Sequence, residues 1–210
     1  MEQKPRARGR PRAFDADAAL ERATRMFSER GFSGTSIADL GAELGLSPPS
    51  LYAAWQSKES LFCQCLRRYS RTEGAKPIDA LCNAQSLASG LAAFFGQLVT
   101  ELSSAEGPRG CFLVAAMAET SALPLEARRI VDDLREARKA ELEGFTARAR
   151  ARGEIRDGID TKLYAALVAS AGLALNIKAR AGTPMRELKR EARMQEAILL
   201  AFAGAGLRLS

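Results

Sequence analysis

The fold is decided by residues 36–58, which read SIADLGAELGLSPPSLYAAWQSK. Three apolar residues in this stretch, Ile37, Leu40 and Leu44, are spaced three and four positions apart. This spacing predicts a short helix with one apolar face, which begins near Thr35 or Ser36 and ends at Leu44.

A sharp turn and a third helix follow directly. Gly45 can adopt the left-handed conformation that ends a helix. Ser47 can then cap a new helix with Pro48 at its first position, and Pro49 is tolerated because it still lies in the first turn. The third helix is expected from Pro48 to about Trp55. Short helices joined by a tight glycine-containing turn are typical of the helix-turn-helix motif.

The flanking residues complete a small domain. Asp15 and Asp17 suit the start of a helix that runs from about residue 15 to residue 30, and Gly31 suits its end. Ser57 caps a fourth helix, which extends to about Arg71. The core that fixes the crossing of the second and third helices is expected to contain Ile37, Leu40, Leu44, Leu46, Leu51 and Trp55.

The rest of the chain also has helical periodicity, so the predicted fold class is all-α. After the break at residues 74–77, amphipathic helices are expected at about 86–104, 109–120, 125–152, 160–180 and 184–203. We predict three segments: a disordered basic arm at 1–12, a helix-turn-helix domain at 13–66, and a second helical domain at 67–210.

The charge is unevenly distributed. Of the formal net charge of +6, residues 1–12 contribute +4, because five basic residues face only Glu2. A short arm rich in Arg, Pro and Gly cannot bury apolar surface and is expected to be disordered. Such arms bind phosphates or enter the DNA minor groove. A merely solubilising tail is the alternative.

Composition also argues against several classes of protein. No stretch is apolar enough to span a membrane, and the basic N-terminus lacks the apolar core of a secretory signal, so a cytoplasmic protein is expected. The chain has no histidine, and its four cysteines do not have the spacing of a zinc or redox motif. We therefore expect no catalytic site, no cofactor and no metal.

Residues 10–66 resemble the TetR/AcrR family of transcriptional regulators. The resemblance rests on the segments GFSGTSIADL (31–40), GLS (45–47), SLY (50–52) and WQSKESLF (55–62) and on their spacing. It implies a homodimer that binds palindromic double-stranded DNA, most often as a repressor released by a small-molecule ligand. The remaining two thirds of the chain fits this family in length and helical character.

The resemblance also implies roles for individual residues. Phosphate contacts are expected from Thr35 or Ser36, Tyr52 and Lys58, and contacts with base edges from Pro48, Pro49 and Ser50. Without the motif, Tyr52 would equally fit a core position and Lys58 a solvated surface position. The complete set of DNA-binding candidates is Arg10, Arg12, Thr35, Ser36, Ser47, Pro48, Pro49, Ser50, Tyr52 and Lys58.

Two features depart from what DNA binding favours. Ala54 stands where the family often has His or Tyr, so one phosphate anchor is absent. Residues 13–62 carry four basic against seven acidic side chains, a net charge of −3. We therefore expect the arm at 1–12 to supply much of the attraction for DNA.

In the second domain, aromatic and Met residues at helical spacing fit either a ligand cavity or an ordinary core. The cavity candidates are Phe94, Phe95, Leu98, Cys111, Phe112, Met117 and Leu134. Cys111 follows Arg109 at an apparent helix start, and both features favour a reactive thiol that could sense electrophiles. A small buried core residue is the alternative for Cys111.

The last helices resemble the family's dimer interface. The segment 165–175 is small and apolar on most sides, which permits close helix packing, although burial within one chain would also explain it. The dimer candidates are Leu167, Ser170, Ala174, Ile198, Leu199 and Phe202. Two other functions remain open: an all-helical enzyme or ligand carrier that retains the N-terminal fold, and a protein-interaction module.

Overall fold

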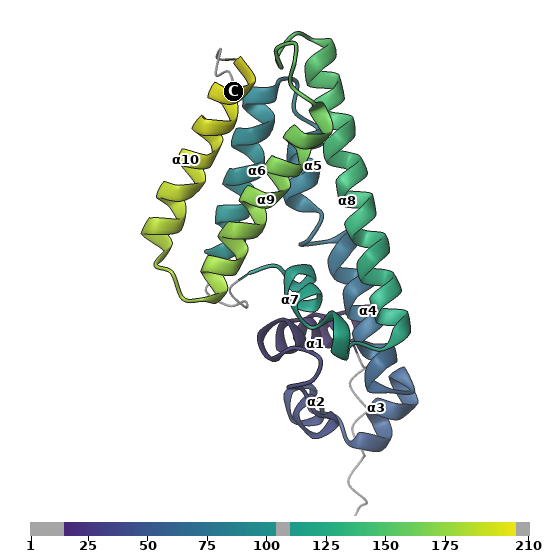
Figure 1. The fold of residues 1–210 in the computed structure, drawn as a ribbon. Helices are drawn as coiled ribbons and strands as arrows, with labels where there is room; N and C mark the ends of the chain where they lie inside the picture. The colour runs from purple at the N-terminus through teal and green to yellow at the C-terminus, as the bar shows by residue number, and fades with distance from the viewer. Residues whose placement is uncertain (1–14, 104–109, 205–210) are drawn as a thin grey trace, which may run out of the picture.

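The computed structural model describes residues 15–103 and 110–204, which contain α-helices, one short 3-10 helix and no strand (Figure 1). The helix-turn-helix end of the molecule is formed by α1, α2 and α3, and α4 and α8 connect it to the opposite end (Figure 1). The helices are α1 (Ala16–Arg30), α2 (Ile37–Leu44), α3 (Pro48–Trp55), α4 (Lys58–Arg71), α5 (Lys76–Cys82), α6 (Leu87–Leu102), α7 (Phe112–Ala118), η1 (Thr120–Ala122), α8 (Leu125–Ala151), α9 (Thr161–Arg180) and α10 (Met185–Gly204). The all-α prediction is confirmed.

Side-chain caps fix the starts of the first helices. The Asp15 carboxylate accepts hydrogen bonds from two backbone N–H groups in the first turn of α1. Ser36, Ser47 and Ser57 accept hydrogen bonds in the same way at the starts of α2, α3 and α4. These caps satisfy N–H groups that have no partner within the helix, so the boundaries predicted for these helices are confirmed.

Two glycines shape the turn between α2 and α3. Gly45 has φ 68° and ψ 32°, the left-handed conformation, and its N–H donates to the Gly41 carbonyl. A Cβ atom on Gly41 would lie 2.8 Å from the Leu46 carbonyl oxygen. The close backbone approach that brings α3 across α2 therefore requires glycine at position 41.

Two predicted elements differ in the structure. Residues 74–77 were expected as a break, but Pro77 lies in the first turn of α5, where proline is tolerated. The helix expected at 109–120 is shorter: α7 covers Phe112–Ala118, and Thr120–Ala122 form the 3-10 helix. Residue 109 lies outside the described residues.

The buried apolar side chains form two clusters. One joins α5, α6, α9, α10 and the C-terminal half of α8. The other contains the core of α1–α4 and also Phe112, Ala116, Leu123, Ile130 and Val131 from α7, its following turn and the start of α8. The N-terminal core thus includes residues from far beyond position 66. The domain boundary at residue 66 remains a prediction. One buried cluster extends across it.

A chain of aromatic contacts runs through this second cluster. Phe62 makes edge-to-face contacts with Phe27, Phe32 and Phe112, with centroid distances of 5.0, 5.1 and 5.4 Å. Phe112 in turn contacts Tyr69 at 5.7 Å. These contacts link the core beneath the helix-turn-helix motif to the C-terminal part of α4.

Candidate nucleic-acid interface

The N-terminal part of α3 is exposed to solvent, and the opposite face of the helix packs against the core. Pro48, Pro49 and Ser50 are exposed, and the Tyr52 side chain is 50% exposed. The opposite face is anchored by Leu51 and Trp55, which are 2% and 4% exposed. A rigid helix that presents its first turn in this way is what insertion into a major groove requires.

The residues around the turns are engaged in capping. The Ser47 hydroxyl oxygen accepts from the Ser50 N–H at 3.3 Å and lies 2.9 Å from the Ser50 hydroxyl. The Ser36 hydroxyl donates to Asp39 at 2.5 Å, and hydrogen bonds from Ser36 lower the pKa of that carboxyl. Both Ser36 and Ser47 remain exposed.

The structure corrects the expectation for Thr35 and gives Lys58 an internal role. Thr35 is 1% exposed and its hydroxyl donates to the Gly31 carbonyl at 2.8 Å, so its side chain cannot reach a phosphate. The Lys58 ammonium donates to the Phe32 and Thr35 carbonyls, each at 3.0 Å, and lies 4.1 Å from the centre of the Phe32 ring. These bonds fix the loop before α2. Arg10 and Arg12 lie outside the described residues.

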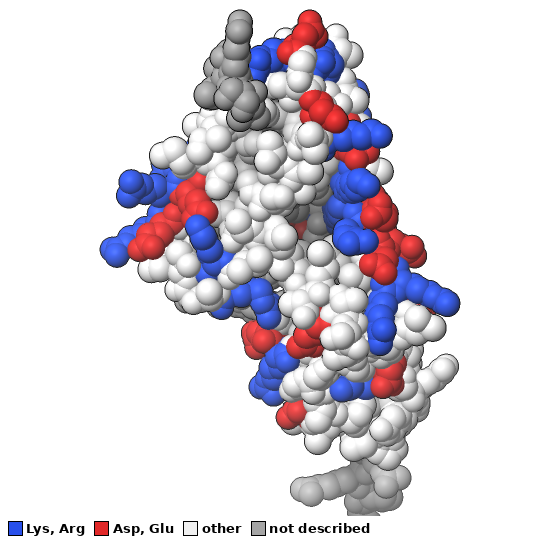
Figure 2. Space-filling view, viewed as in Figure 1, with Lys and Arg blue, Asp and Glu red and all other residues white. Residues whose placement is uncertain are grey.

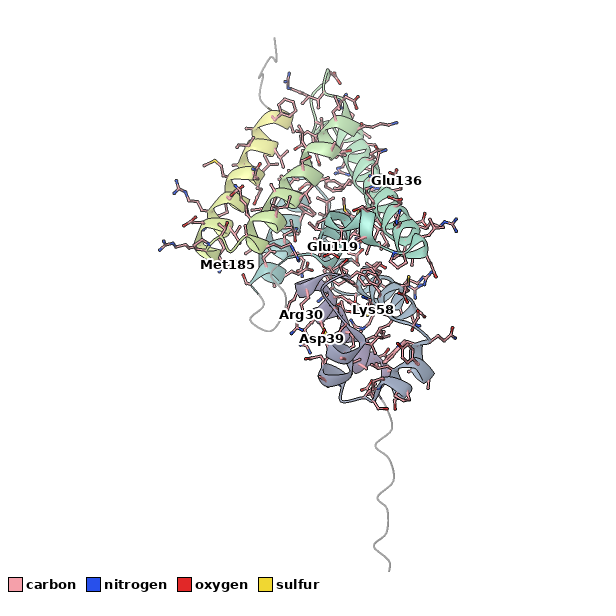
Figure 3. All side chains as sticks on the ribbon, turned by 60° about the horizontal axis from the view of Figure 1, so that its bottom comes forward. Arg30, Asp39, Lys58, Glu119, Glu136 and Met185 are labelled. Carbon is pink, nitrogen blue, oxygen red and sulfur yellow. The ribbon has the colours of Figure 1, made fainter. Side chains whose placement is uncertain are left out.

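A contact that the sequence does not predict joins this loop to the other half of the chain. Glu119, the residue directly after α7, accepts hydrogen bonds from the Phe32 N–H at 2.9 Å and the Ser33 N–H at 3.4 Å. Figure 3 shows Glu119 where the upper and lower parts of the molecule meet, above Arg30 and Lys58. The Arg180 guanidinium adds a bond to the Ser28 carbonyl at 2.8 Å. The orientation of α1–α3 is thus fixed by α7 and α9.

A cavity of about 450 Å³ lies between α4, α6, α7, α8 and α9. Its volume falls within the usual range for small-molecule sites. Five of the predicted residues line it: Phe94, Leu98, Cys111, Met117 and Leu134. Phe95 and Phe112 do not. Phe95 is buried in the C-terminal core, and Phe112 packs on Phe62.

The predicted dimer residues divide between surface and core. Leu167 is 48% and Ile198 54% exposed, Ser170 is exposed and Ala174 half-buried. Leu199 corrects the prediction: it is 5% exposed, because one step along the helix turns its side chain into the core of its own chain. Phe202 is half-buried and stacks on Tyr164.

Three exposed apolar residues that were not among the candidates extend this surface. Leu163 and Ile177 of α9 are 67% and 53% exposed, and Met194 of α10 is 54% exposed. Leu163 and Met194 each lie four positions from Leu167 or Ile198, a spacing that could have identified them. Figure 2 shows a largely uncharged surface over α9 and the C-terminal half of α10, whereas the N-terminal half of α10 carries charged side chains.

Two further properties bear on other functions. Across residues 15–103 and 110–204, no three His, Cys, Asp or Glu side chains come together as a group that could hold a metal ion. Within the same ranges, each helix is too short or too polar to cross a bilayer.

The fold and this exposed α3 define a helix-turn-helix protein with an attached helical domain. Two family models match the chain: "Bacterial regulatory proteins, tetR family" over residues 19–65, and "Tetracyclin repressor-like, C-terminal domain" over residues 87–194. The chain therefore belongs to the TetR family, and it is a DNA-binding transcriptional regulator.

Individual relatives agree with this assignment. The HTH-type transcriptional repressor ComR of Escherichia coli K12 is 32% identical over 184 residues, which cover 87% of this chain and 88% of that protein. A cysteine variant of the TetR family regulator CifR, solved with a 26-bp operator DNA, is 33% identical with a TM-score of 0.77. That match covers 90% of this chain and 98% of CifR. A TetR family regulator from Agrobacterium tumefaciens has the same fold, with a TM-score of 0.78 at 20% identity over 87% of this chain and 96% of that one.

Proposed function

We propose that the chain is a homodimeric repressor that binds a palindromic operator through α3 and leaves it when a small molecule fills the cavity. The observation that carries this proposal is the exposed first turn of α3, anchored by the buried side chains of Leu51 and Trp55. The operator complex of CifR, a related regulator, supports the proposal.

The proposed DNA contacts follow from exposure and chemistry. Pro48, Pro49 and Ser50 approach the base edges, where a short hydroxyl gives one hydrogen bond and prolines contact a thymine methyl. The Tyr52 hydroxyl donates to a phosphate, which sets the position of the domain on the duplex. The Ser36 hydroxyl already donates to Asp39, so we do not include it among the phosphate donors. No residue from Gly45 to Ser57 is charged, so attraction at longer range falls to the arm at 1–12.

The proposed dimer forms through the exposed apolar surface of α9 and α10. Leu163, Leu167 and Ile177 form one stripe, and Met194 and Ile198 form its neighbour. Two such pairs packed around a two-fold axis would bury both stripes in a four-helix interface. The same axis relates two copies of α3, which matches an operator with two-fold symmetry.

The proposed release mechanism uses the position of the cavity. Its walls include α4, which connects the two halves, and α7, which holds the loop before α2 through Glu119. A ligand that favours one arrangement of these helices shifts the population of dimers away from the spacing that fits DNA. The proposal involves no catalytic step or cofactor. It places the protein in the cytoplasm, with the DNA that it regulates.

The test is fluorescence-anisotropy binding of the full chain to the DNA upstream of its own coding region, at two salt concentrations. Scrambled duplex serves as competitor. Binding that resists the scrambled duplex is the expected result. Binding that the scrambled duplex removes equally well would contradict operator recognition, and absence of binding at low salt would favour a ligand carrier.

Two variants that each add one carboxylate test the role of α3. Ser50→Glu puts the carboxylate on the exposed first turn and should weaken operator binding by at least about tenfold, because it repels phosphate. Gln85→Glu is the control, since Gln85 is also exposed but lies in the turn between α5 and α6. Because the two variants have the same net charge, equal affinities for the operator would mean that α3 does not lie in the DNA interface.

A further inference from the structure

The cavity between the two halves has a mostly hydrocarbon wall. Leu66, Phe94, Leu98, Met117 and Leu134 contribute to it from α4, α6, α7 and α8. A site of this kind favours a ligand with an apolar body, and a few polar groups then decide which head group is bound.

Most of the polar side chains in the wall are already occupied. The hydroxyls of Ser70 and Ser170 donate to carbonyls in the preceding turns of their own helices. The Asn176 amide is also engaged: its oxygen accepts from the Cys111 N–H at 2.7 Å, and its nitrogen donates to the Gly172 carbonyl at 2.9 Å. Each of these three side chains therefore has at least one protein partner.

Glu101 of α6 is the exception. Its Oε1 atom is buried and has no hydrogen-bond partner among the described residues. Burial raises the pKa of this carboxyl to about 7, and a hydrogen bond from Gln97 and the charges of Lys76 and Arg138 oppose that rise. Glu73 acts in the same direction as burial. A carboxyl oxygen that is buried without a hydrogen-bond donor is costly, and a positively charged donor would remove that cost.

Two further groups lie beside Glu101. Tyr69 of α4 and Cys111 at the start of α7 border the cavity together with it. Burial raises the pKa of the Tyr69 phenol well above its usual range, and the neighbouring Cys111 and Glu101 contribute to the increase. Tyr69 therefore stays neutral, so Glu101 supplies the negative charge in this group.

The basic residues that α8 contributes to the wall pair with acidic residues of the same helix. Arg135 pairs with Asp132 and Glu136, and Lys139 also pairs with Glu136. Arg138 pairs with Glu141 at 3.9 Å. Figure 2 shows these alternating charges along α8. Lys162 and Glu143 line the cavity with opposite charges. A carboxylate ligand would thus meet paired cations at α8 and an unpaired acid at Glu101.

We infer that the cavity takes an apolar amine, whose ammonium group binds the carboxylate of Glu101 beside Tyr69 and Cys111. The inference rests on the proposal that this cavity is the effector site, and it names the chemical class of the effector. The ammonium supplies a hydrogen-bond donor to a carboxylate whose Oε1 atom has none among the described residues, and it brings a positive charge into direct contact with that carboxylate.

The test uses three probes with the same body: 4-phenylbutylamine, 4-phenylbutanol and 4-phenylbutyrate. Their affinities for the full chain are measured by isothermal titration calorimetry at pH 8. The amine should bind about tenfold or more tightly than the alcohol, because it forms a charge-assisted bond, and the carboxylate should bind most weakly. Equal binding of amine and alcohol, tighter binding of the carboxylate, or no binding of the amine would overturn the inference.

Two matched variants locate the charge. Glu101→Gln keeps the shape of the side chain and should reduce the affinity for the amine by about tenfold or more, with no loss for the alcohol. Glu187→Gln removes an exposed acidic side chain of α10, outside the cavity wall, and should leave the amine affinity unchanged. A Glu101→Gln protein that keeps its amine affinity would overturn the inference.

The pH dependence gives an independent measurement. The amine is cationic throughout the range, whereas Glu101 ionises as pH rises through its pKa of about 7. Affinity for the amine should therefore rise about tenfold between pH 6 and pH 8, and the rise should disappear in Glu101→Gln. A flat profile in the unmodified chain would contradict the inference.

Direct binding keeps this test separate from the proposed function. Operator binding without ligand tests whether the chain is a repressor, and calorimetry tests the chemistry of the cavity. A chain that binds its operator but prefers the alcohol retains the proposed function and loses this inference. A chain that binds the amine through Glu101 but binds no operator loses the proposed function and retains the ligand chemistry inferred for the cavity.

Discussion

Gly31 and Glu119 illustrate how single residues join the two halves of the molecule. Gly31 has φ 74° and ψ 176°, a backbone conformation that is almost exclusive to glycine. A Cβ atom at this position would lie 1.9 Å from the Glu119 Oε1 atom. Absence of a side chain at position 31 therefore allows the Glu119 carboxylate to reach the Phe32 and Ser33 N–H groups.

We predict that Gly31→Ala lowers the free energy of unfolding by about 2 kcal/mol or more, because it combines backbone strain with displacement of Glu119. Urea denaturation followed by circular dichroism measures the change. Gly45→Ala is the control: its φ is 68°, but nothing lies within 4 Å of the added Cβ atom, so strain alone should cost about 1 kcal/mol. Equal losses in the two variants would mean that Glu119 adjusts without cost.

The sequence predicted the exposed face of α3 because local signals determine it. Caps and prolines fix where the helix begins, and apolar spacing fixes which face is buried. Thr35 was misassigned because its burial depends on how the loop folds back over Gly31. The bond between Glu119 and Phe32 spans 87 positions, and no local pattern indicates such a contact.

At the level of elements, α7 is short but connects several parts of the molecule. Cys111 at its start and Met117 near its end border the cavity, Phe112 packs on the aromatic chain, and Glu119 at its end holds the loop before α2. A helix of this length has little intrinsic stability, so tertiary contacts maintain it. Because these tertiary contacts are not visible in the local sequence, the predicted bounds of this helix differ from the observed ones.

We predict that Glu119→Ala makes the Phe32 amide exchange with solvent at least about tenfold faster, because the amide loses a charge-assisted bond of roughly 1.5–3 kcal/mol. Hydrogen exchange followed by NMR measures the rate. The Leu40 amide, which bonds the Ser36 carbonyl within α2, should keep its rate. Faster exchange at both amides would indicate general destabilisation of the domain instead.

At the scale of the whole molecule, apolar side chains on the outer faces of α9 and α10 are proposed to determine the assembly. We predict that Leu167→Glu converts a dimer into a monomer, because it places a charge within the apolar stripe. Light scattering after size-exclusion chromatography measures the mass. Leu125→Glu is the control, since Leu125 is 63% exposed but begins α8, away from the stripe. A Leu167→Glu dimer would place the interface elsewhere.

The charge of the whole chain leads to a prediction for the arm. Because residues 13–62 carry a net charge of −3, deletion of residues 1–12 should weaken operator binding and reduce its dependence on salt. The slope of log K against log salt should fall by about one for each phosphate that the arm neutralises. Anisotropy titrations at several salt concentrations measure this slope, and an unchanged slope would exclude the arm from the interface.

The shared N-terminal core limits how this protein can be recombined with its relatives. Phe112, Ala116 and Ile130 belong to the same buried cluster as Phe62 and Trp55. A chimera joined at residue 66 would strip these partners from the helix-turn-helix end and expose aromatic surface, which promotes misfolding and aggregation. A graft that alters operator choice while keeping a foreign sensor domain should therefore carry compatible residues 112–131 along with the first four helices.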